Sequence, residues 1–308
     1  MRKEDEASRN WTNWIGQTYH FIGRPDMRRS NVKVLMYHRV TVDGKGPQDY
    51  YWSVTQSQLR NQLSLLQKLG FTCISFEDHS LSLKGKLILP RKPVILTFDD
   101  GYHDVYQYAL PVLKEFGVRA TVFAIGDRSI RTNSWDDPKK YSEATLLDDD
   151  MLKELHRAGI ELGSHSMTHA DLTRLGKDAV IEEMTQSKAS LETLLNSPVI
   201  SFAYPYGATT PEIQRLAKSA GYEYGCGSYS GPPTFSANLF NIQRTLITSR
   251  TDVIGLAFRL LNAYPHYRWM VWKLRESITG VLNRSEFPEG GSSFDKADAI
   301  HESTGKFL

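Results

Sequence analysis

The sequence predicts an α/β protein whose parallel strands form a barrel or a barrel-like sheet. Short apolar runs, typical of buried strands, alternate with longer stretches that suit helices and end at a glycine. Repeated units of this kind are typical of a parallel sheet. Polar residues directly follow several of the apolar runs, and in barrels of this class the chemistry lies at the carboxyl ends of the strands.

The strands are predicted from runs rich in Val, Ile, Leu, Phe and Tyr. Six of them cover residues 32–37, 71–74, 94–100, 120–125, 160–162 and 200–204. Two further candidates lie around Tyr224 and over 240–247. The polar stretches 41–50 and 127–147 are predicted to be loops, and the second of them carries Trp135.

The helix boundaries follow from capping residues and terminal glycines. Ser57, Asp148 and Thr210 are the expected N-caps. Pro211 stands at the first helical position, which proline favours. The expected helices cover residues 57–69, 102–116, 148–159, 176–196 and 210–220. The second should bend at its proline, and residues 75–93 are predicted to be a polar connection.

The composition is that of an ordinary globular protein. Of the 308 residues, 40% are hydrophobic, which is enough to fill a sizeable core. Lys and Arg number 37 against 35 Asp and Glu, and the resulting charge of +2 gives no case for a nucleic-acid-binding protein. The two cysteines, Cys73 and Cys226, are far apart in the sequence, which excludes a disulfide framework and a cysteine-rich metal site.

The chain is expected to have four parts. In order they are an N-terminal amphipathic segment, an α/β domain, two C-terminal helices and a disordered polar tail, over residues 1–31, 32–250, 251–282 and 283–308. The charged N-terminus leads into no apolar run, and no stretch is long and apolar enough to span a membrane. The expected location is therefore cytoplasmic.

Two adjacent carboxylates, Asp99 and Asp100, fall where a buried strand should end, and Gly101 turns the chain away. Neighbouring strand residues point to opposite faces, so the pair can act together only if the backbone turns there. Glycine permits such a turn. One carboxylate could then bind a metal while its neighbour acts as a base. The alternative is a solvated Asp-Asp-Gly turn.

Three further motifs also follow predicted strands. His165 and His169 can face the same way on a helical turn, and two imidazoles with one carboxylate suit zinc or a similar divalent ion. Tyr206 lies in a sharp Tyr-Pro-Tyr-Gly loop whose backbone N–H can serve an oxyanion. His38 ends the first strand, where a histidine could protonate a leaving amine. Taken alone, each motif is more commonly explained by structural histidines or an ordinary turn.

The order Thr-Phe-Asp-Asp-Gly, His-Ser-Met-Thr-His, Tyr-Pro-Tyr-Gly resembles the polysaccharide deacetylase family, the NodB-homology proteins of carbohydrate esterase family 4. Met-Tyr-His-Arg-Val at 36–40 resembles its circularly permuted branch, which includes poly-N-acetylglucosamine deacetylases. The resemblance covers about residues 32–250, which would form the catalytic domain. It implies a distorted (β/α) barrel of about seven parallel strands.

Carried over residue by residue, the resemblance makes Asp99 the general base and His38 the general acid. It gives the backbone N–H of Tyr206 to the oxyanion. The implied ligands of one divalent metal ion, most often zinc, are Asp100, His165 and His169.

Two departures from the family pattern concern the orientation of the base. Many members have an arginine two residues before the proline of the third motif, and this chain has Ala203 there. Arg244, predicted in a late strand, is the candidate replacement. The usual Asp-Trp motif of the family is absent.

The resemblance implies hydrolysis of the N-acetyl amide of a sugar in a polysaccharide, an oligosaccharide or a lipid-linked glycan, with release of acetate, as in exopolysaccharide biosynthesis. The chain has no GxSxG nucleophile elbow that would support a serine hydrolase. Two alternatives stay open. One is hydrolysis of a non-sugar amide, and the other is an inactive relative that serves as a carbohydrate-binding or assembly subunit.

Residues 253–275 contain no acidic side chain but combine basic residues with aromatic ones, among them Trp269 and Trp272. Short helices of this composition suit a membrane interface. The alternative is that they pack against the barrel with their basic groups in water. Peripheral contact with the inner face of a membrane through residues 253–275 is therefore a hypothesis.

Overall fold

Parallel strands form the central sheet of the protein, for which a computed structural model describes residues 32–44, 51–136, 138, 141–228 and 238–261. The strands are β1 (Lys33–Tyr37), β4 (Thr72–Ile74), β5 (Pro93–Phe98), β6 (Thr121–Ala124), β7 (Glu161–Ser164), β8 (Ser201–Ala203), β9 (Tyr224–Cys226) and β10 (Thr245–Leu246). Their order is β10-β1-β5-β6-β7-β8-β9, and β4 pairs with the first half of β5. All of these pairings are parallel, which confirms the predicted distorted (β/α) barrel.

The two edges of the curled sheet approach each other through residues 242–246. Ile242 pairs with Cys226 of β9, whereas Thr245 pairs with Leu35 of β1. Arg244 lies between these two pairings. The strand predicted over 240–247 is therefore shorter in the structure. It consists of β10, which pairs with β1, and a single bridge at Ile242, which pairs with β9.

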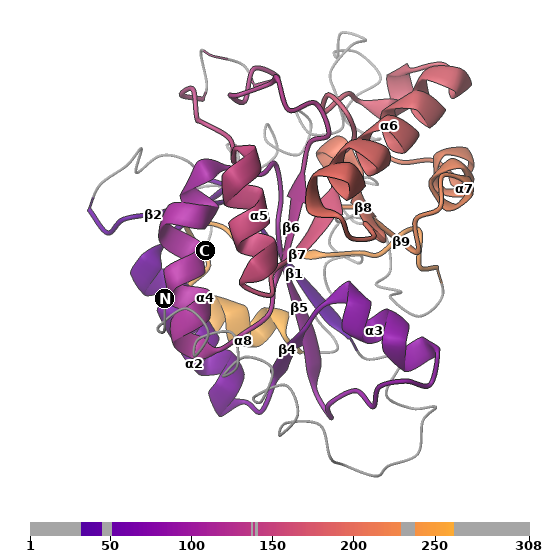
Figure 1. Cartoon of the computed structure of the whole chain (residues 1–308). Helices are drawn as coiled ribbons and strands as arrows, with labels where there is room; N and C mark the ends of the chain where they lie inside the picture. The colour runs from indigo at the N-terminus through magenta and orange to yellow at the C-terminus, as the bar shows by residue number, and fades with distance from the viewer. Residues whose placement is uncertain (1–31, 45–50, 137, 139–140, 229–237, 262–308) are drawn as a thin grey trace, which may run out of the picture.

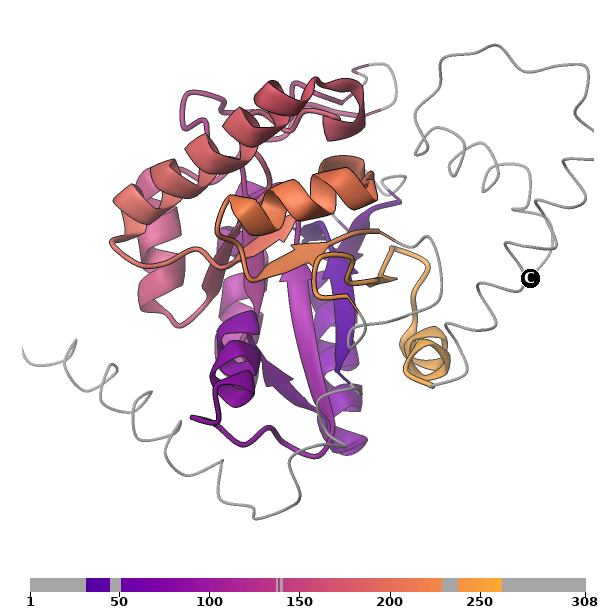
Figure 2. The same ribbon diagram turned by 90° about the vertical axis from the view of Figure 1, so that its right-hand side faces the viewer.

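The helices cover the sheet on both faces, as Figures 1 and 2 show. They are α2 (Gln56–Lys68), α3 (Phe76–Leu83), α4 (Leu110–Phe116), α5 (Asp149–Arg157), α6 (Lys177–Leu195), α7 (Pro211–Ser219) and α8 (Val253–Arg259). A large buried cluster joins the outer face of the sheet to α2, α4, α5, α6 and α7. A second cluster joins Phe76 of α3 to inner-face side chains such as Ile95 and Phe123. Because strand side chains alternate, Thr97 and Asp99 continue the inner row begun by Ile95.

Several helix boundaries confirm the sequence predictions. Asp148 and Thr210 cap α5 and α7, and their side chains accept hydrogen bonds from backbone N–H groups three residues on. The expected N-cap Ser57 is wrong, because Thr55 forms a capping box with Gln58 and α2 begins at Gln56. The hydroxyl of Ser57 instead donates to a neighbouring carboxylate.

One helix and two short strands were not predicted. The polar connection 75–93 contains α3, which Ser75 and Asp78 start with a capping box. Strands β2 (Arg39–Thr41) and β3 (Ser53–Thr55) form a separate two-stranded parallel sheet that flanks the predicted loop 41–50.

The helix predicted over 102–116 contains a π-helical turn, η1 (Val105–Ala109), followed by α4. Pro111 supplies the reason, since it has no N–H with which to continue the regular ladder. The bend expected at this proline thus takes the form of a wider turn just before it.

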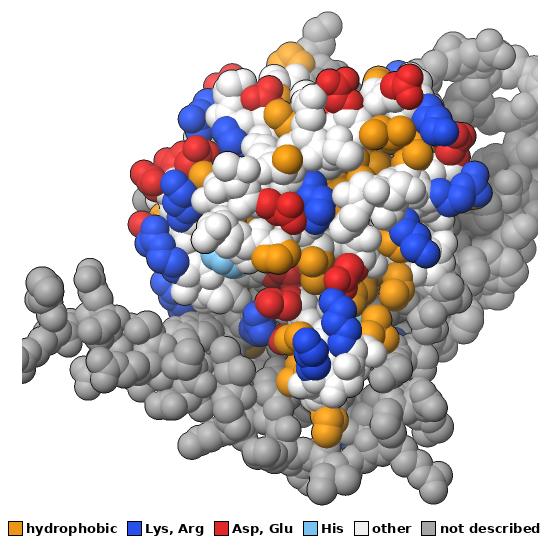
Figure 3. All heavy atoms as spheres, turned by 45° about the vertical axis from the view of Figure 1, so that its right-hand side comes forward, with side chains coloured by type: hydrophobic (Ala, Val, Ile, Leu, Met, Phe, Trp, Pro, Cys, Tyr) orange, Lys and Arg blue, Asp and Glu red, His pale blue; other side chains and the backbone are white. Residues whose placement is uncertain are grey.

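The predictions for residues 1–31 and 283–308 lie outside the described residues. Of the two C-terminal helices expected over 251–282, the described part contains α8. Within that part, none of the helices has the length and apolar character needed to cross a membrane. On the face shown in Figure 3, acidic and basic side chains are interspersed, so no field of a single sign forms there.

Candidate metal and catalytic site

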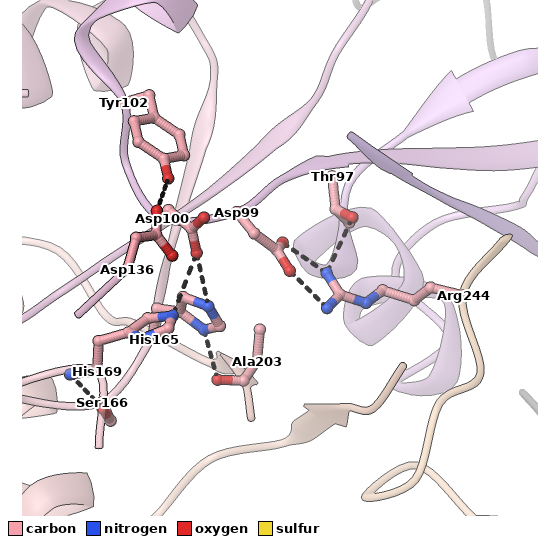
Figure 4. Close-up of polar contacts among 10 residues, drawn as sticks. All are labelled: Thr97, Asp99, Asp100, Tyr102, Asp136, His165, Ser166, His169, Ala203 and Arg244. Carbon is pink, nitrogen blue, oxygen red and sulfur yellow. Dashed lines mark hydrogen bonds and ion pairs between the residues drawn. The ribbon is translucent and has the colours of Figure 1, made fainter. Parts of the chain in front are cut away.

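Three buried side chains converge at the carboxyl end of the sheet, as Figure 4 shows. Asp100 follows β5, while His165 and His169 follow β7. The Asp100 Oδ1 atom lies 3.1 Å from His165 Nε2 and 3.3 Å from His169 Nε2. All three ligand atoms lie within 4.8 Å of one another. The structure therefore brings together the residues that the sequence predicts as metal ligands.

Backbone turns rather than a helix aim these side chains. Asp100, Ser166 and His169 have φ angles of 70°, 65° and 63°. The helical turn expected between the two histidines is wrong, because residues 165–169 are not helical and the His169 N–H donates to Ser166 Oγ at 3.0 Å. Left-handed conformations of non-glycine residues cost about 1–3 kcal/mol each, and among the described residues they gather at this site.

The contacts of His165 decide whether the cluster fits a metal ion. Its Nδ1 lies 2.8 Å from the carbonyl oxygen of Ala203, and because that oxygen only accepts, Nδ1 must carry the hydrogen. The neutral ring then presents the lone pair of Nε2 to the Asp100 carboxylate. Two electron-rich atoms repel each other at this distance unless a proton or a cation lies between them.

The spacing of the three ligand atoms also suits a cation. Zinc ligands at about 2.0–2.2 Å in tetrahedral geometry are about 3.3–3.5 Å from one another. The separations of Asp100 Oδ1 from the two histidine nitrogens are close to these values. Burial lowers the pKa of His169, whereas the hydrogen bond and charge of Asp100 more than offset burial and raise the pKa of His165. The donor set therefore fits a divalent cation such as zinc.

Asp99 lies beside this cluster and is paired with Arg244. The Arg244 Nη1 and Nη2 atoms each lie 2.6 Å from one oxygen of the Asp99 carboxylate, a bidentate arrangement. The same guanidinium donates to Thr97 Oγ1 at 3.1 Å and to the Gly227 carbonyl oxygen at 3.0 Å. Arg244 is only 1% exposed, so its position is fixed from three sides.

The pair keeps Asp99 ionised. Burial alone would raise the pKa of this carboxyl, but the charge and hydrogen bonds of Arg244 more than offset the effect, and the pKa lies below its ordinary value. Arg244, the candidate replacement for the arginine absent at Ala203, thus contacts the carboxylate that it was expected to orient. It comes from the segment that closes the barrel rather than from the third motif.

His38 follows β1 at the same end of the sheet and is 9% exposed. The centroid of its ring lies 5.0 Å from that of Trp52, and its buried Nδ1 has no hydrogen-bond partner among the residues that the structure describes. Burial lowers the pKa of His38, although the negative charges of Asp100 and Asp99 partly oppose the shift.

Tyr206 occupies the turn after β8, within η3 (Pro205–Gly207), and has a φ of 58°. Its ring contacts the ring of His169 edge-on at 4.8 Å between centroids. A side chain at Gly207 would collide with Ser228, since a Cβ there would lie 2.0 Å from its Oγ. The loop thus holds Tyr206 next to the histidines, and the oxyanion role of its backbone N–H stays a prediction.

Sequence reasoning missed two neighbours of the site in the loop 127–147. The Trp135 ring is stacked on His169 at 4.3 Å between centroids with an interplanar angle of 19°. Asp136 lies beside Asp100 in Figure 4. The only signal in the sequence was an aromatic residue next to acidic ones in a polar loop, which does not by itself indicate a site.

Comparisons with known proteins find relatives of this chain. Residues 86–225 match the model of a family described as polysaccharide deacetylase. The chain is 26% identical to the Bacillus subtilis protein YxkH over 248 residues, which are 80% of this chain and 78% of that protein. It is 25% identical over 206 residues to a Staphylococcus aureus poly-beta-1,6-N-acetyl-D-glucosamine N-deacetylase, covering 64% of this chain and 68% of that enzyme.

Solved structures give the same result. The Streptococcus pyogenes deacetylase PplD, solved in complex with acetate, superposes with a TM-score of 0.64 at 26% identity. The match covers 75% of this chain and 98% of PplD.

Proposed function

We propose, from the membership of residues 86–225 in the polysaccharide deacetylase family, that this chain is a metal-dependent N-deacetylase of an N-acetylated glycan. The observation that carries the proposal is one arrangement of five side chains. A buried carboxylate paired with a guanidinium lies beside a cluster fit for a divalent cation, and the residues are Asp99, Arg244, Asp100, His165 and His169.

Hydrolysis of an amide needs a base for the attacking water and an acid for the departing amine. Asp99 is suited to the first role, because it is ionised and its orientation is fixed by Arg244. It would take the proton of the water at a carboxylate oxygen. A divalent cation held by Asp100 and the two histidines would act as a Lewis acid on the amide carbonyl and favour ionisation of the attacking water.

His38 is suited to the second role. Its lowered pKa makes the imidazolium a stronger acid, which favours transfer of a proton to the nitrogen of the departing amine. The turn that holds Tyr206 beside His169 would direct a backbone N–H at the oxygen of the carbonyl as negative charge develops. Both roles use groups of this chain that lie at the carboxyl end of the sheet.

The substrate class is proposed from the relatives. A Staphylococcus aureus relative is named for poly-beta-1,6-N-acetyl-D-glucosamine, so a polymer or oligomer of this sugar is the first substrate to test. Chitooligosaccharides and a lipid-linked N-acetylated sugar complete the set. Release of acetate from each is the measurement, and a simple non-sugar acetamide distinguishes a general amidase.

The decisive comparison is between the wild type and Asp99→Asn. The variant keeps the shape of the side chain and the metal ligands but cannot accept a proton. Acetate release from a glycan by the wild type, lost in the variant, supports the proposal. A wild-type protein that binds a glycan but releases no acetate, with its metal content intact, would favour the alternative of an inactive binding subunit.

We also propose that α8 contacts a membrane surface. Ile254, Phe258 and Leu261 lie on one stripe of this segment and are 76%, 45% and 52% exposed. The sequence that continues from them to residue 275 has no acidic side chain. Apolar side chains with basic neighbours suit an anionic bilayer surface.

A further inference from the structure

The loop 127–147 is tied to the site at several points. Thr132 pairs with Thr145 and Leu146 with Tyr102, both in antiparallel bridges. The side chain of Asn133 accepts from the Ala144 N–H at 2.6 Å and donates to the Ser142 carbonyl oxygen at 3.3 Å. The ring of Trp135 then rests on His169. The loop is thus attached to a predicted metal ligand rather than merely adjacent to it.

This attachment brings the carboxylate of Asp136 to the site. Its Oδ2 accepts from Asn133 Nδ2 at 2.7 Å and from the Tyr102 hydroxyl at 3.3 Å. Figure 4 shows the carboxylate between Tyr102 and Asp100. Burial raises the pKa of Tyr206, and the negative charge of Asp136 adds to this shift.

The two oxygens of this carboxylate differ in their contacts. Among the described residues Asp136 Oδ1 makes no hydrogen bond, and the hydrolysis proposed above assigns the residue no task. It is not one of the three clustered ligand atoms either. The hydrogen bonds to Oδ2 fix the orientation of this carboxylate, and Oδ1 is available to accept a hydrogen bond from a ligand.

We propose that Asp136 is a specificity-determining residue that accepts a hydrogen bond from a hydroxyl group of the substrate sugar. The inference rests on the proposed glycan deacetylase activity. In a β-1,6-linked 2-acetamido sugar, a hydroxyl group is on the ring carbon next to the one that carries the amide. When the amide lies between Asp99 and the metal ligands, such a hydroxyl must therefore lie next to the reacting atoms, in the part of the site that Asp136 borders.

A hydroxyl donor suits the geometry better than an apolar group. A hydrogen bond to a carboxylate contributes more than a bond between two neutral groups, so a sugar that supplies the hydroxyl is preferred over a substrate that does not. Trp135, next in the chain, offers an apolar edge beside this acceptor. An acceptor beside an aromatic ring is a combination that suits a sugar, which has both hydroxyl groups and C–H faces.

The test compares two substrates in the holoenzyme. One is an oligomer of β-1,6-linked N-acetylglucosamine, and the other is 4-methylumbelliferyl acetate, an acetyl ester without sugar hydroxyls. We expect Asp136→Ala to lower kcat/KM for the oligomer about 10- to 100-fold, the effect of one hydrogen bond to a charged group. Hydrolysis of the ester and the bound metal per chain should remain at wild-type values.

The matched control is Asp127→Asn, in the same loop, because within the described residues the side chain of Asp127 bonds to its neighbour Ser129 alone. An equal loss on both substrates, or a loss of metal, would show that Asp136 supports the cluster instead and would overturn the inference. Wild-type rates on both substrates would overturn it as well. A wild type that cleaves the ester but no glycan would overturn the proposed function and with it the inference.

Discussion

Asp99 and Arg244, 145 positions apart in the sequence, form a buried ion pair with two contacts of 2.6 Å. Asp99 follows the central strand β5, whereas Arg244 lies in the segment that joins the two edges of the sheet. Barrel closure and the orientation of the proposed base therefore depend on the same few residues. A change in that segment should alter the chemistry and the fold together.

Replacement of Arg244 by lysine should separate these two effects. Lysine keeps the charge but loses the bidentate contact. The pKa of Asp99 should then rise, because burial is less well offset, and the acid limb of the profile of kcat/KM against pH should move to higher pH. At neutral pH we expect kcat about 10- to 100-fold lower, within the range for a misplaced general base.

Stability is the control for this variant. Arg244→Ala would leave a buried carboxylate unpaired, at a cost of about 3–5 kcal/mol, and is the less informative change. Arg250→Lys, at an exposed position, should leave the pH profile unchanged. A lower Tm in Arg244→Lys with an unshifted acid limb would mean that Arg244 is structural only.

The metal prediction concerns Asp100, His165 and His169. We expect one divalent ion per chain, zinc by preference, with activity lost to a chelator and restored by added metal. Asp100→Ala and His165→Ala should each abolish stoichiometric binding in calorimetric titration. His156→Ala, on α5, is the control histidine and should bind as the wild type does. Full activity of a protein shown to be metal-free would contradict the prediction.

The convergence of the site residues could be predicted from the sequence, because each of them directly follows a strand that the sequence reveals. Apolar runs locate the strands, and in a parallel sheet their carboxyl ends share one edge. Asp99, Asp100 and His165 each follow such a run. Their separate loops could therefore be expected to converge before any distance was known.

The remaining features depend on contacts that no local pattern encodes. The left-handed backbone of Asp100 and His169 is imposed by surrounding packing, since intrinsic preference disfavours it in both residues. The stacking of Trp135 on His169 joins a loop to a strand end without any periodic signal. Helix α3 was missed because its short polar sequence gives little periodicity, although Ser75 and Asp78 supply a capping box.

The pH dependence of turnover should report His38. A general acid must be protonated, and burial lowers the pKa of His38 below its ordinary 6.5. The alkaline limb of kcat/KM should therefore begin below pH 6.5, with activity falling as the pH rises. His38→Gln should lower turnover about 100- to 10,000-fold and remove this limb. An unchanged limb in the variant would assign the acid to another group.

Stability should depend on pH through Glu161 of β7. Burial raises the pKa of this carboxyl from 4.5 to about 7. Between these values the unfolded chain loses the proton while the folded protein keeps it, so the free energy of unfolding falls as the pH rises through the window. Above pH 7 the difference is constant.

Glu161→Gln cannot ionise and still offers an acceptor to the Glu77 N–H, which the carboxylate now binds at 3.0 Å. We expect the Tm of the variant to exceed that of the wild type at pH 8 and to match it near pH 4.5. Glu143→Gln, at an exposed position, serves as the control. A constant difference between Glu161→Gln and the wild type at both pH values would contradict the linkage.

Membrane contact through α8 predicts binding to anionic vesicles. Ile254 is 76% exposed, so Ile254→Asp should not disturb the fold, yet it places a charge on the proposed contact stripe. We expect the wild type to co-sediment with phosphatidylglycerol vesicles at low salt and less at higher salt, because screening weakens the attraction of the basic groups.

Ile254→Asp should bind about tenfold more weakly, the effect of one lost apolar side chain. Ile88→Asp, at an exposed isoleucine outside α8, is the matched control and should bind as the wild type does. Absence of sedimentation at low salt, or an equal loss in both variants, would leave the exposed stripe of α8 as a surface that does not bind membranes.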